Sequence, residues 1–117
     1  MQYLLMLYAD ESGWTRMSKA EQERGVAAYA AYTEALSAAG ALKGGNRLAP
    51  SGSATRVTVA DGKTQVLDGP YADTKEQLAG YYLIDVPDLD AALSWAKRNP
   101  GASHGIVEVR ALWTDPR

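Results

Sequence analysis

The sequence predicts an α+β fold in which one antiparallel sheet carries two helices on one face. Short apolar runs typical of strands alternate along the chain with two segments whose apolar residues recur at helical spacing. An Asp-Gly pair at positions 61 and 62 lies between two strand-like runs and is a strong signal for a β-hairpin. The length of 117 residues and the hydrophobic content of 46% suit a single domain spanning residues 1–117.

The first two elements are a strand over residues 3–8 and a helix that begins near residue 18. The run YLLMLY is apolar throughout and short enough for a buried strand. Ser18 and Glu21 form the S-x-x-E pattern of a capping box, in which each side chain accepts a hydrogen bond from the other residue's backbone N–H. Gly40 is suited to end this helix. Residues at helical spacing mark the face that we expect to be buried, namely Val26, Tyr29, Ala30, Thr33 and Leu36.

The middle of the chain predicts a strand-like piece followed by a hairpin. Residues 41–53 are rich in turn formers and contain one short strand-like piece. Residues 54–59 (ATRVTV) and 63–67 (KTQVL) flank the Asp-Gly pair and form the two strands of the hairpin.

The second half of the chain supplies two more strands and a helix. Residues 80–86 (GYYLIDV) are apolar and rich in strand formers, and Pro87 ends this strand. Asp88 can cap a helix whose apolar residues are Leu89, Ala92, Leu93 and Ala96. Residues 106–112 (IVEVRAL) form the last strand. The order β-α-β-β-β-α-β is a ferredoxin-like pattern with an extra strand in one antiparallel sheet.

Helices on one face leave the second face of the sheet uncovered. Exposed Tyr, Leu and Val side chains there would form an apolar patch large enough to mark an interface. A homodimer that packs sheet against sheet would cover it, and twofold symmetry is the commonest way for two copies to pair. A small-molecule ligand could bind between the two sheets, or between a sheet and its loops.

Composition argues against several classes of function. The chain has 12 basic and 14 acidic residues, so no basic excess is available to neutralise phosphates, and we expect no nucleic-acid binding. It has no cysteine and a single histidine, His104, so we expect no metal site. Residues 43–46 (KGGN) lack the spacing of a glycine-rich phosphate loop, so we expect no bound cofactor. The N-terminal apolar run is too short to span a bilayer and no basic segment precedes it, which predicts a cytoplasmic protein without membrane contact.

Residues 68–77 (DGPYADTKEQ) carry more polar chemistry than a simple connection needs. Asp68, Asp73 and Lys75 are candidate catalytic residues, because a carboxylate near an ammonium group can act as an acid/base pair. A second interpretation is that Asp73 caps a single helical turn while Lys75 and Glu76 face water. A third is that the whole segment is architectural.

Two arginines within strands are candidates for binding an anionic ligand. Arg56 and Arg110 each interrupt an apolar alternation, and Arg110 shares a face with Glu108 because the two residues are two apart on a strand. An arginine fork recognises a carboxylate or phenolate well, and Tyr81 could supply a hydroxyl group beside it. The alternative is a solvated sheet edge.

Four segments resemble the YCII-related family, in its branch with a DGPF motif. They are MQYLLMLYADE at residues 1–11, ATRV at 54–57, DGPYADTKEQLAGYYLIDVPDLDAALSWA at 68–96 and VEVRAL at 107–112. The chain has Tyr71, Asp73 and Ala79 where the motif has Phe, Glu and Gly. By position, the motif residues carried over are Asp68, Gly69, Pro70, Thr74, Lys75, Glu76, Gly80 and Tyr81, flanked by Arg56, Glu108 and Arg110.

The resemblance implies a bacterial dimeric α/β-barrel of the ferredoxin-like class. Family members are often encoded beside sigma factors of the extracytoplasmic-function type. The broader family is associated with a histidine–aspartate pair near the first helix, but residues 14–40 contain no histidine, so that pair cannot be carried over.

Two functions therefore remain open. One is a cofactor-free enzyme that transfers a proton on a small aromatic or carboxylate compound, with Asp68 or Asp73 as the base and Arg56 or Arg110 as the anion clamp. The other is a non-catalytic ligand-binding or regulatory module with a link to a sigma factor.

Overall fold

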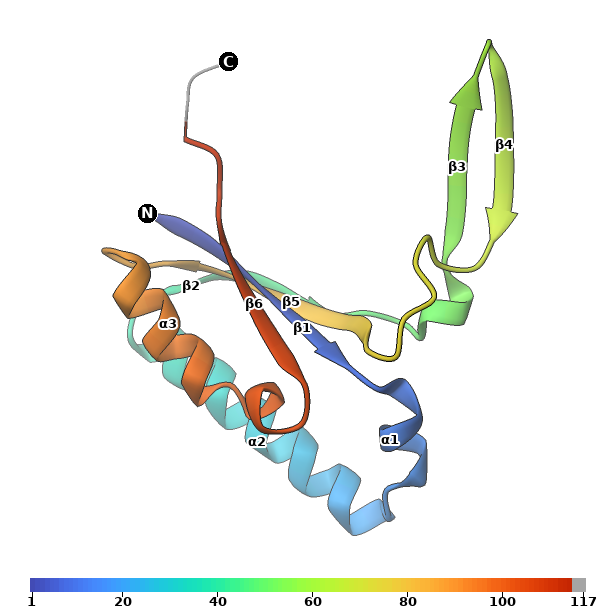
Figure 1. The fold of residues 1–117 in the computed structure, drawn as a ribbon. Helices are drawn as coiled ribbons and strands as arrows, with labels where there is room; N and C mark the ends of the chain where they lie inside the picture. Colours follow the sequence, from blue (N-terminus) through green and yellow to red (C-terminus); the bar gives the residue numbers. More distant parts are fainter. Residues whose placement is uncertain (115–117) are drawn as a thin grey trace.

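The computed structural model describes residues 1–114 and confirms the predicted α+β class, an antiparallel sheet with helices on one face (Figure 1). Along the chain the elements are β1 (Gln2–Ala9), α1 (Glu11–Arg16), α2 (Lys19–Ala38), β2 (Leu42–Arg47), the 3-10 turn η1 (Ser51–Ser53), β3 (Thr55–Ala60), β4 (Lys63–Asp68), β5 (Gln77–Asp85), α3 (Leu89–Arg98), the 3-10 turn η2 (Pro100–Ser103) and β6 (Ile106–Ala111).

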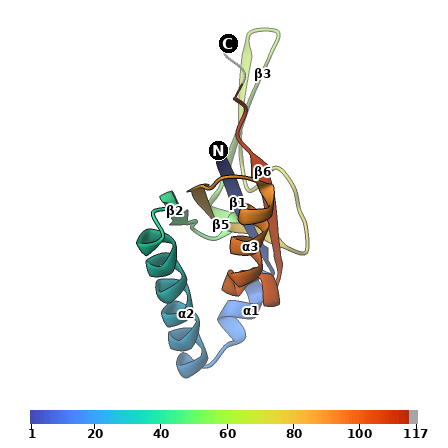
Figure 2. The same ribbon diagram turned by 90° about the vertical axis from the view of Figure 1, so that its left-hand side faces the viewer.

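Within the described chain the main sheet has four antiparallel strands in the order β2-β5-β1-β6. The apolar run of β1 places this strand between β5 and β6, so that Leu5 lies between Tyr82 on one side and Val109 on the other. Helices α2 and α3 cover one face of this sheet (Figure 2). The core lies between these helices and the sheet, and its largest fully buried side chains are Leu5, Leu36 and Ile84.

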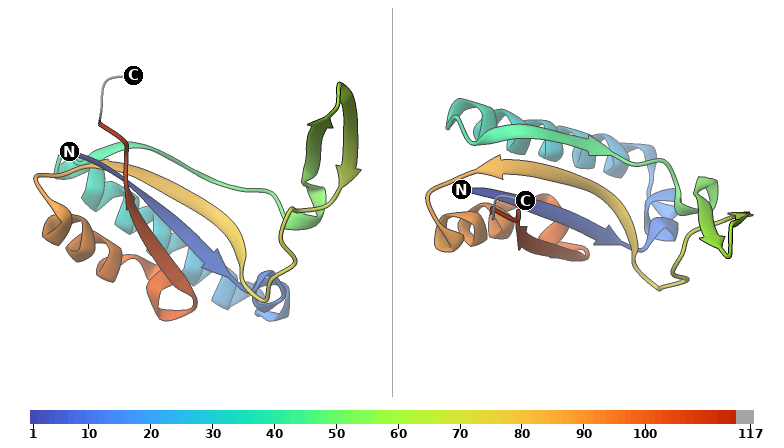
Figure 3. Two further views of the ribbon diagram at one scale, coloured as in Figure 1. Left: turned by 45° about the horizontal axis from the view of Figure 1, so that its top comes forward. Right: turned by 90° about the horizontal axis from the view of Figure 1, so that it is seen from above.

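The hairpin forms as predicted, but its expected place in the main sheet is wrong. Strands β3 and β4 pair only with each other among the described strands, and we call this hairpin (residues 55–68) the arm. Its tip is Asp61-Gly62, both with positive φ of 51° and 72°, which is the backbone that a two-residue hairpin turn requires. After β2 the chain leaves the sheet through η1, and the arm stands away from the body of the protein (Figure 3).

The first helix that follows β1 was not predicted, because its six residues carry no periodic signal. Asp10 caps it by accepting a hydrogen bond from the Ser12 backbone N–H at 3.0 Å. The Trp14 ring of α1 packs on α2 at Gly25, where an added Cβ would lie 3.4 Å from the ring. Gln22 of α2 also donates a hydrogen bond to the Trp14 carbonyl at 2.9 Å.

Helix α2 starts at the predicted capping box, with Ser18 and Glu21 bonded reciprocally. Its predicted inner face is only partly right. Leu36 is buried, but Val26 and Ala30 are exposed. The reason is that the N-terminal half of α2 packs on α1 instead of on the sheet. In α3, likewise, Ala92 and Ala96 are buried whereas Leu89 and Leu93 remain exposed.

Among residues 1–114, no helix combines the length and apolar character that crossing a membrane would require.

A pair of substitutions in α2 tests which part of this helix carries the core. Leu36 is 0% exposed and Val26 is 56% exposed. Leu36→Ala is expected to lower the free energy of unfolding by about 2–5 kcal/mol, because it opens a cavity in the core. Val26→Ala should change it by no more than about 0.5 kcal/mol. Urea denaturation measures both, and similar losses for the two variants would contradict this packing.

Candidate functional site

Three of the predicted ligand-binding residues share the face of the main sheet that no helix covers. We call this the open face, and it comprises Leu4, Met6, Tyr8, Tyr81, Leu83, Ile106, Glu108 and Arg110. Arg110 Nη2 donates to Glu108 Oε2 at 3.1 Å, and Asn46 Nδ2 donates to the Tyr81 hydroxyl at 3.1 Å. Both side chains of the ion pair are substantially exposed, so their pairing contributes little to stability.

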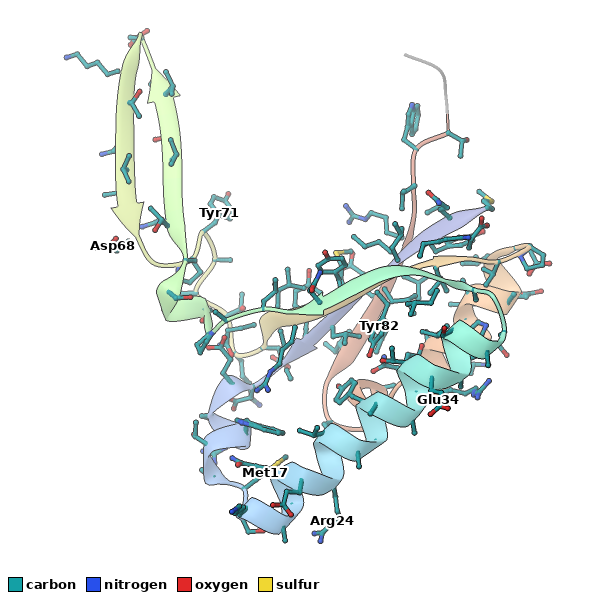
Figure 4. The ribbon with its side chains drawn as sticks, turned by 180° about the vertical axis from the view of Figure 1, so that it is seen from behind. Met17, Arg24, Glu34, Asp68, Tyr71 and Tyr82 are labelled. Atoms are coloured by element: carbon teal, nitrogen blue, oxygen red, sulfur yellow. The ribbon has the colours of Figure 1, made fainter. Side chains whose placement is uncertain are left out.

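The three predicted catalytic residues lie on the solvent-exposed segment that returns from the arm to β5. Asp68 ends β4 at the base of the arm (Figure 4), and Asp73 and Lys75 follow in the connecting loop. No helical turn follows Asp73, so the interpretation of this residue as a helix cap is wrong. The loop is held instead by Gln77, whose Nε2 donates to the Thr74 carbonyl at 2.5 Å.

Arg56 lies on β3, half-buried, and its Nε atom is buried without a hydrogen-bond partner among residues 1–114. The arm leaves the sheet at the end of β1 that runs into α1, whereas Arg110 pairs with Leu4 near the opposite end (Figure 1). The two predicted anion clamps therefore do not meet within one protomer.

The base of the arm is held by a carboxylate of α1. Both oxygens of Glu11 accept hydrogen bonds from Ser51, one from its backbone N–H at 2.6 Å and one from its hydroxyl at 2.8 Å. The backbone N–H of Glu11 in turn donates to the Gln77 side chain at 3.0 Å. Glu11 thus ties together the ends of β1, of the arm and of β5, which is a structural role.

A second group of polar and aromatic residues lies on the helix side of the sheet, and the sequence did not predict it as a site. We call it the aromatic cluster, and it comprises Trp14, Tyr29, Thr33, Arg47 and Tyr82. The Arg47 guanidinium carbon lies 4.7 Å from the centre of the Trp14 ring, a cation–π contact. No carboxylate in the described part of the chain pairs with Arg47. Beside it, Gly80 is buried and leaves no room for a side chain, because an added Cβ would lie 2.9 Å from the Asn46 carbonyl oxygen.

Hydrogen bonds fix one hydroxyl of the aromatic cluster and leave another free. The Thr33 hydroxyl donates to the Tyr29 carbonyl at 2.9 Å, so its own oxygen accepts from the Tyr82 hydroxyl, also at 2.9 Å. Tyr82 lies between the sheet and α2 (Figure 4). The Tyr29 hydroxyl makes no hydrogen bond to any residue of the range 1–114, and it lies against Gly101 of η2, where an added Cβ would be 2.8 Å from it.

Burial sets the protonation of the tyrosines around this cluster. Burial raises the pKa of Tyr29, the neighbouring Tyr82 phenol raises it further, and the Arg47 charge lowers it. Burial also raises the pKa of Tyr32 to about 12, and the Tyr32 hydroxyl donates to the Trp95 carbonyl at 2.7 Å. Both phenols are therefore neutral hydrogen-bond donors near neutral pH.

The side chains of the aromatic cluster suit a negatively charged oxygen. An unpaired guanidinium beside an aromatic ring can recognise such an oxygen when it is attached to a ring. This arrangement could not be predicted from the sequence, because Arg47 lies in a turn-rich segment 33 residues away from Trp14. Tyr29 was expected only as part of a buried helix face.

Two hollows of the protomer surface lie away from the aromatic cluster. One of about 470 Å³ is lined by Thr58, Ala60, Asp61, Lys63, Thr64 and Gln65 near the tip of the arm, and one of about 190 Å³ lies along residues 111–114. Neither contains a predicted site residue or a member of the aromatic cluster. We therefore define the candidate site by its side-chain chemistry.

An alkaline titration tests the environment of Tyr32. Its folded-state pKa lies above the unfolded value of 10.0, so this phenol stabilises the folded protein below pH 10, and the contribution is lost as the pH rises towards about 12. Tyr32→Phe should therefore remove one tyrosinate from the late, high-pH part of the absorbance titration. Loss of signal from the early part instead would show that this phenol is not shielded.

Comparisons with known proteins agree with the fold. The chain matches the YCII-related domain over residues 1–114. It is 42% identical over 114 residues to Uncharacterized protein R00369 of Rhizobium meliloti (strain 1021), covering 96% of this chain and 92% of that protein. Among solved structures it is similar to 5-chloro-2-hydroxyhydroquinone dehydrochlorinase (TftG) from Burkholderia phenoliruptrix AC1100 in complex with 2,5-dihydroxybenzoquinone. The TM-score is 0.59 with 15% identity, covering 99% of this chain and 96% of that one, which is a likeness of fold. The chain belongs to the YCII-related domain family.

Proposed function

We propose that this protein binds a small aromatic compound with a negatively charged oxygen at the aromatic cluster, without a metal or a bound cofactor. The observation that carries the proposal is the Arg47 guanidinium, which stacks on Trp14 and has no carboxylate partner in residues 1–114. A cation held against a ring and left unpaired is suited to an aromatic anion, because the ring of the ligand can pack beside Trp14 while its oxygen pairs with the guanidinium.

Tyr29 would complete the recognition. Its hydroxyl has no hydrogen-bond partner in residues 1–114 and its pKa is raised by burial, so it stays protonated. The Tyr29 side chain would turn away from Gly101, against which its hydroxyl lies, to donate a hydrogen bond to the oxygen that Arg47 neutralises. If the bound compound reacts, the chain's residues suit the loss of a carbon-bound ligand proton to a base outside the aromatic cluster, with Arg47 stabilising the negative charge that develops on the ligand oxygen. The likeness of fold to a dehydrochlorinase solved with a dihydroxybenzoquinone supports the same ligand class.

A non-catalytic ligand-binding or regulatory module, with the sigma-factor link that the family resemblance implies, is the second candidate. One observation favours it. The titrating groups of the aromatic cluster other than Arg47 are phenols, and Tyr29 is protonated at neutral pH, so the cluster supplies a donor but no base. Exchange of carbon-bound ligand protons for solvent deuterium, followed by NMR with and without the protein, separates the two candidates, because a module that only binds the ligand does not accelerate this exchange.

The proposed assembly is a homodimer in which the open faces of two copies meet. The open face carries Leu4, Met6 and Leu83 across β1 and β5, and these apolar side chains have no helix above them. A twofold axis places the same patch on both sides of the interface. In such a dimer Tyr81, Glu108 and Arg110 would face the space between two sheets, which keeps them as candidate ligand-binding residues. Asp68, Asp73, Lys75 and Arg56 remain candidates for contributions across the interface.

Binding of a matched pair of ligands tests the role of Arg47. Hydroxybenzoates should bind, while the corresponding neutral aryl alcohols should bind at least about tenfold more weakly, because they lack the charge that pairs with the guanidinium. Arg47→Met should remove this preference in calorimetric titrations.

The control for this experiment is Arg24→Met, the same side-chain change at an exposed position of α2. Equal binding of anionic and neutral ligands, or equal effects of the two substitutions, would contradict the proposal.

A substitution on the open face tests the dimer. Ile106 lies on the open face of β6 and is 55% exposed. Ile106→Asp should raise the dimer dissociation constant at least about tenfold, because it would bury a carboxylate between the two sheets. Leu89→Asp is the matched control, since Leu89 is 50% exposed but lies on α3, on the opposite side of the sheet. Sedimentation velocity over a range of concentrations measures both, and a dimer that is weakened equally by both changes argues against the open face.

A further inference from the structure

The arm presents an apolar face that nothing in its own protomer covers. Val57 and Val66 pair across the hairpin and share a face with Val59, and these three side chains are 61%, 60% and 65% exposed. The opposite face, which we call the polar face, carries Arg56, Thr58, Lys63 and Gln65 together with Ala60 and Leu67, and Leu67 is 43% exposed. The three valines therefore make their side of the ribbon the more apolar one.

The regularity of the arm also requires a partner. A two-stranded hairpin alone in water is at best marginally stable. The arm nevertheless keeps six consecutive residue pairs, from Thr55 opposite Asp68 to Ala60 opposite Lys63. Its base is fixed by Glu11 through Ser51 and by the Gly69 backbone N–H, which donates to the Ala54 carbonyl at 2.7 Å. The arm is thus aimed in a fixed direction and is not a loose loop.

The direction and length of the arm indicate which surface it can contact. It rises on the side of the main sheet that carries the open face, opposite to α2 and α3 (Figures 1 and 2). The radius of gyration is 16.4 Å, against about 13 Å for a compact domain of this length. A six-residue strand spans about 20 Å, whereas two packed sheets lie about 10 Å apart. The arm is therefore long enough to reach beyond the sheet of a second molecule packed on the open face.

We propose that the arm clasps a second copy of this chain, laying the face formed by Val57, Val59 and Val66 against the flank of the partner. This proposal rests on the homodimer proposed above and goes beyond it, because it assigns the arm as part of the interface. One partner then covers both apolar surfaces of the protomer, the open face and the valine face of the arm. Twofold symmetry makes every arm contact occur twice.

The test compares two triple variants of the full-length protein. Val57→Ser, Val59→Ser and Val66→Ser together should raise the dimer dissociation constant at least about tenfold, because six buried valine side chains per dimer would be lost. Thr58→Ala, Lys63→Ala and Gln65→Ala, on the polar face of the same strands, should change it less than about twofold. Sedimentation velocity measures the constants, and circular dichroism checks that both variants fold.

Hydrogen exchange supplies a second measurement that does not depend on a variant. Backbone amides of residues 55–68 in the wild-type protein should become protected as the dimer fraction rises with concentration, since the covered ribbon opens less often. Arm amides that stay unprotected in the dimer, or a serine variant that dimerises like the polar-face variant, would overturn the proposal. If Ile106→Asp still dissociates the dimer in that case, the open face remains the proposed interface and only the contribution of the arm is excluded. A wild-type protein that is monomeric at every concentration would overturn both.

Discussion

A sheet with helices on only one side leaves half of its side chains without a core, and most features of this protein follow from that constraint. The central strand β1 is apolar on both faces. Tyr3, Leu5 and Leu7 are buried beneath the helices, whereas Leu4 and Met6 point to the open face. Since burial of apolar area drives folding at about 25 cal/mol per Å², the second set contributes fully only when another surface covers it. The sequence of one strand thus accounts for the packing under the helices and for an apolar set of side chains on the open face.

The same strand arrangement separates the two places where chemistry can occur. On the helix side, the N-terminal half of α2 packs on α1 instead of on the sheet, and Arg47 lies over the Trp14 ring of α1. On the open face, Glu108 and Arg110 form an exposed pair that a second copy would enclose. An anionic ligand suits the first place because its cation is unpaired. The second place has its charges balanced already.

Short sequence patterns predicted much of this fold. The capping box of Ser18 and Glu21, the Asp-Gly turn and the apolar run of β1 each act over a few residues, so each can be recognised in a sequence. Helix α1 could not be predicted, because six residues are too few for a periodic pattern and too few for a stable isolated helix. The separation of the hairpin from the main sheet could not be predicted either, because the alternation of apolar and polar residues in β3 and β4 suits a hairpin inside the sheet as well as one outside it. The aromatic cluster depends on residues that only the tertiary fold brings together, and no spacing rule joins Arg47 to Trp14.

If two copies pair as proposed, the anchored arm also affects how quickly they can separate. A flat interface between sheets can open by a single sliding or tilting motion. Two arms that pass beyond the partner's sheet would each have to be withdrawn before the sheets could separate, and their bases are held by the Glu11–Ser51 hydrogen bonds and cannot simply swing aside. Subunit exchange in such a dimer would then be slower than the equilibrium affinity alone implies.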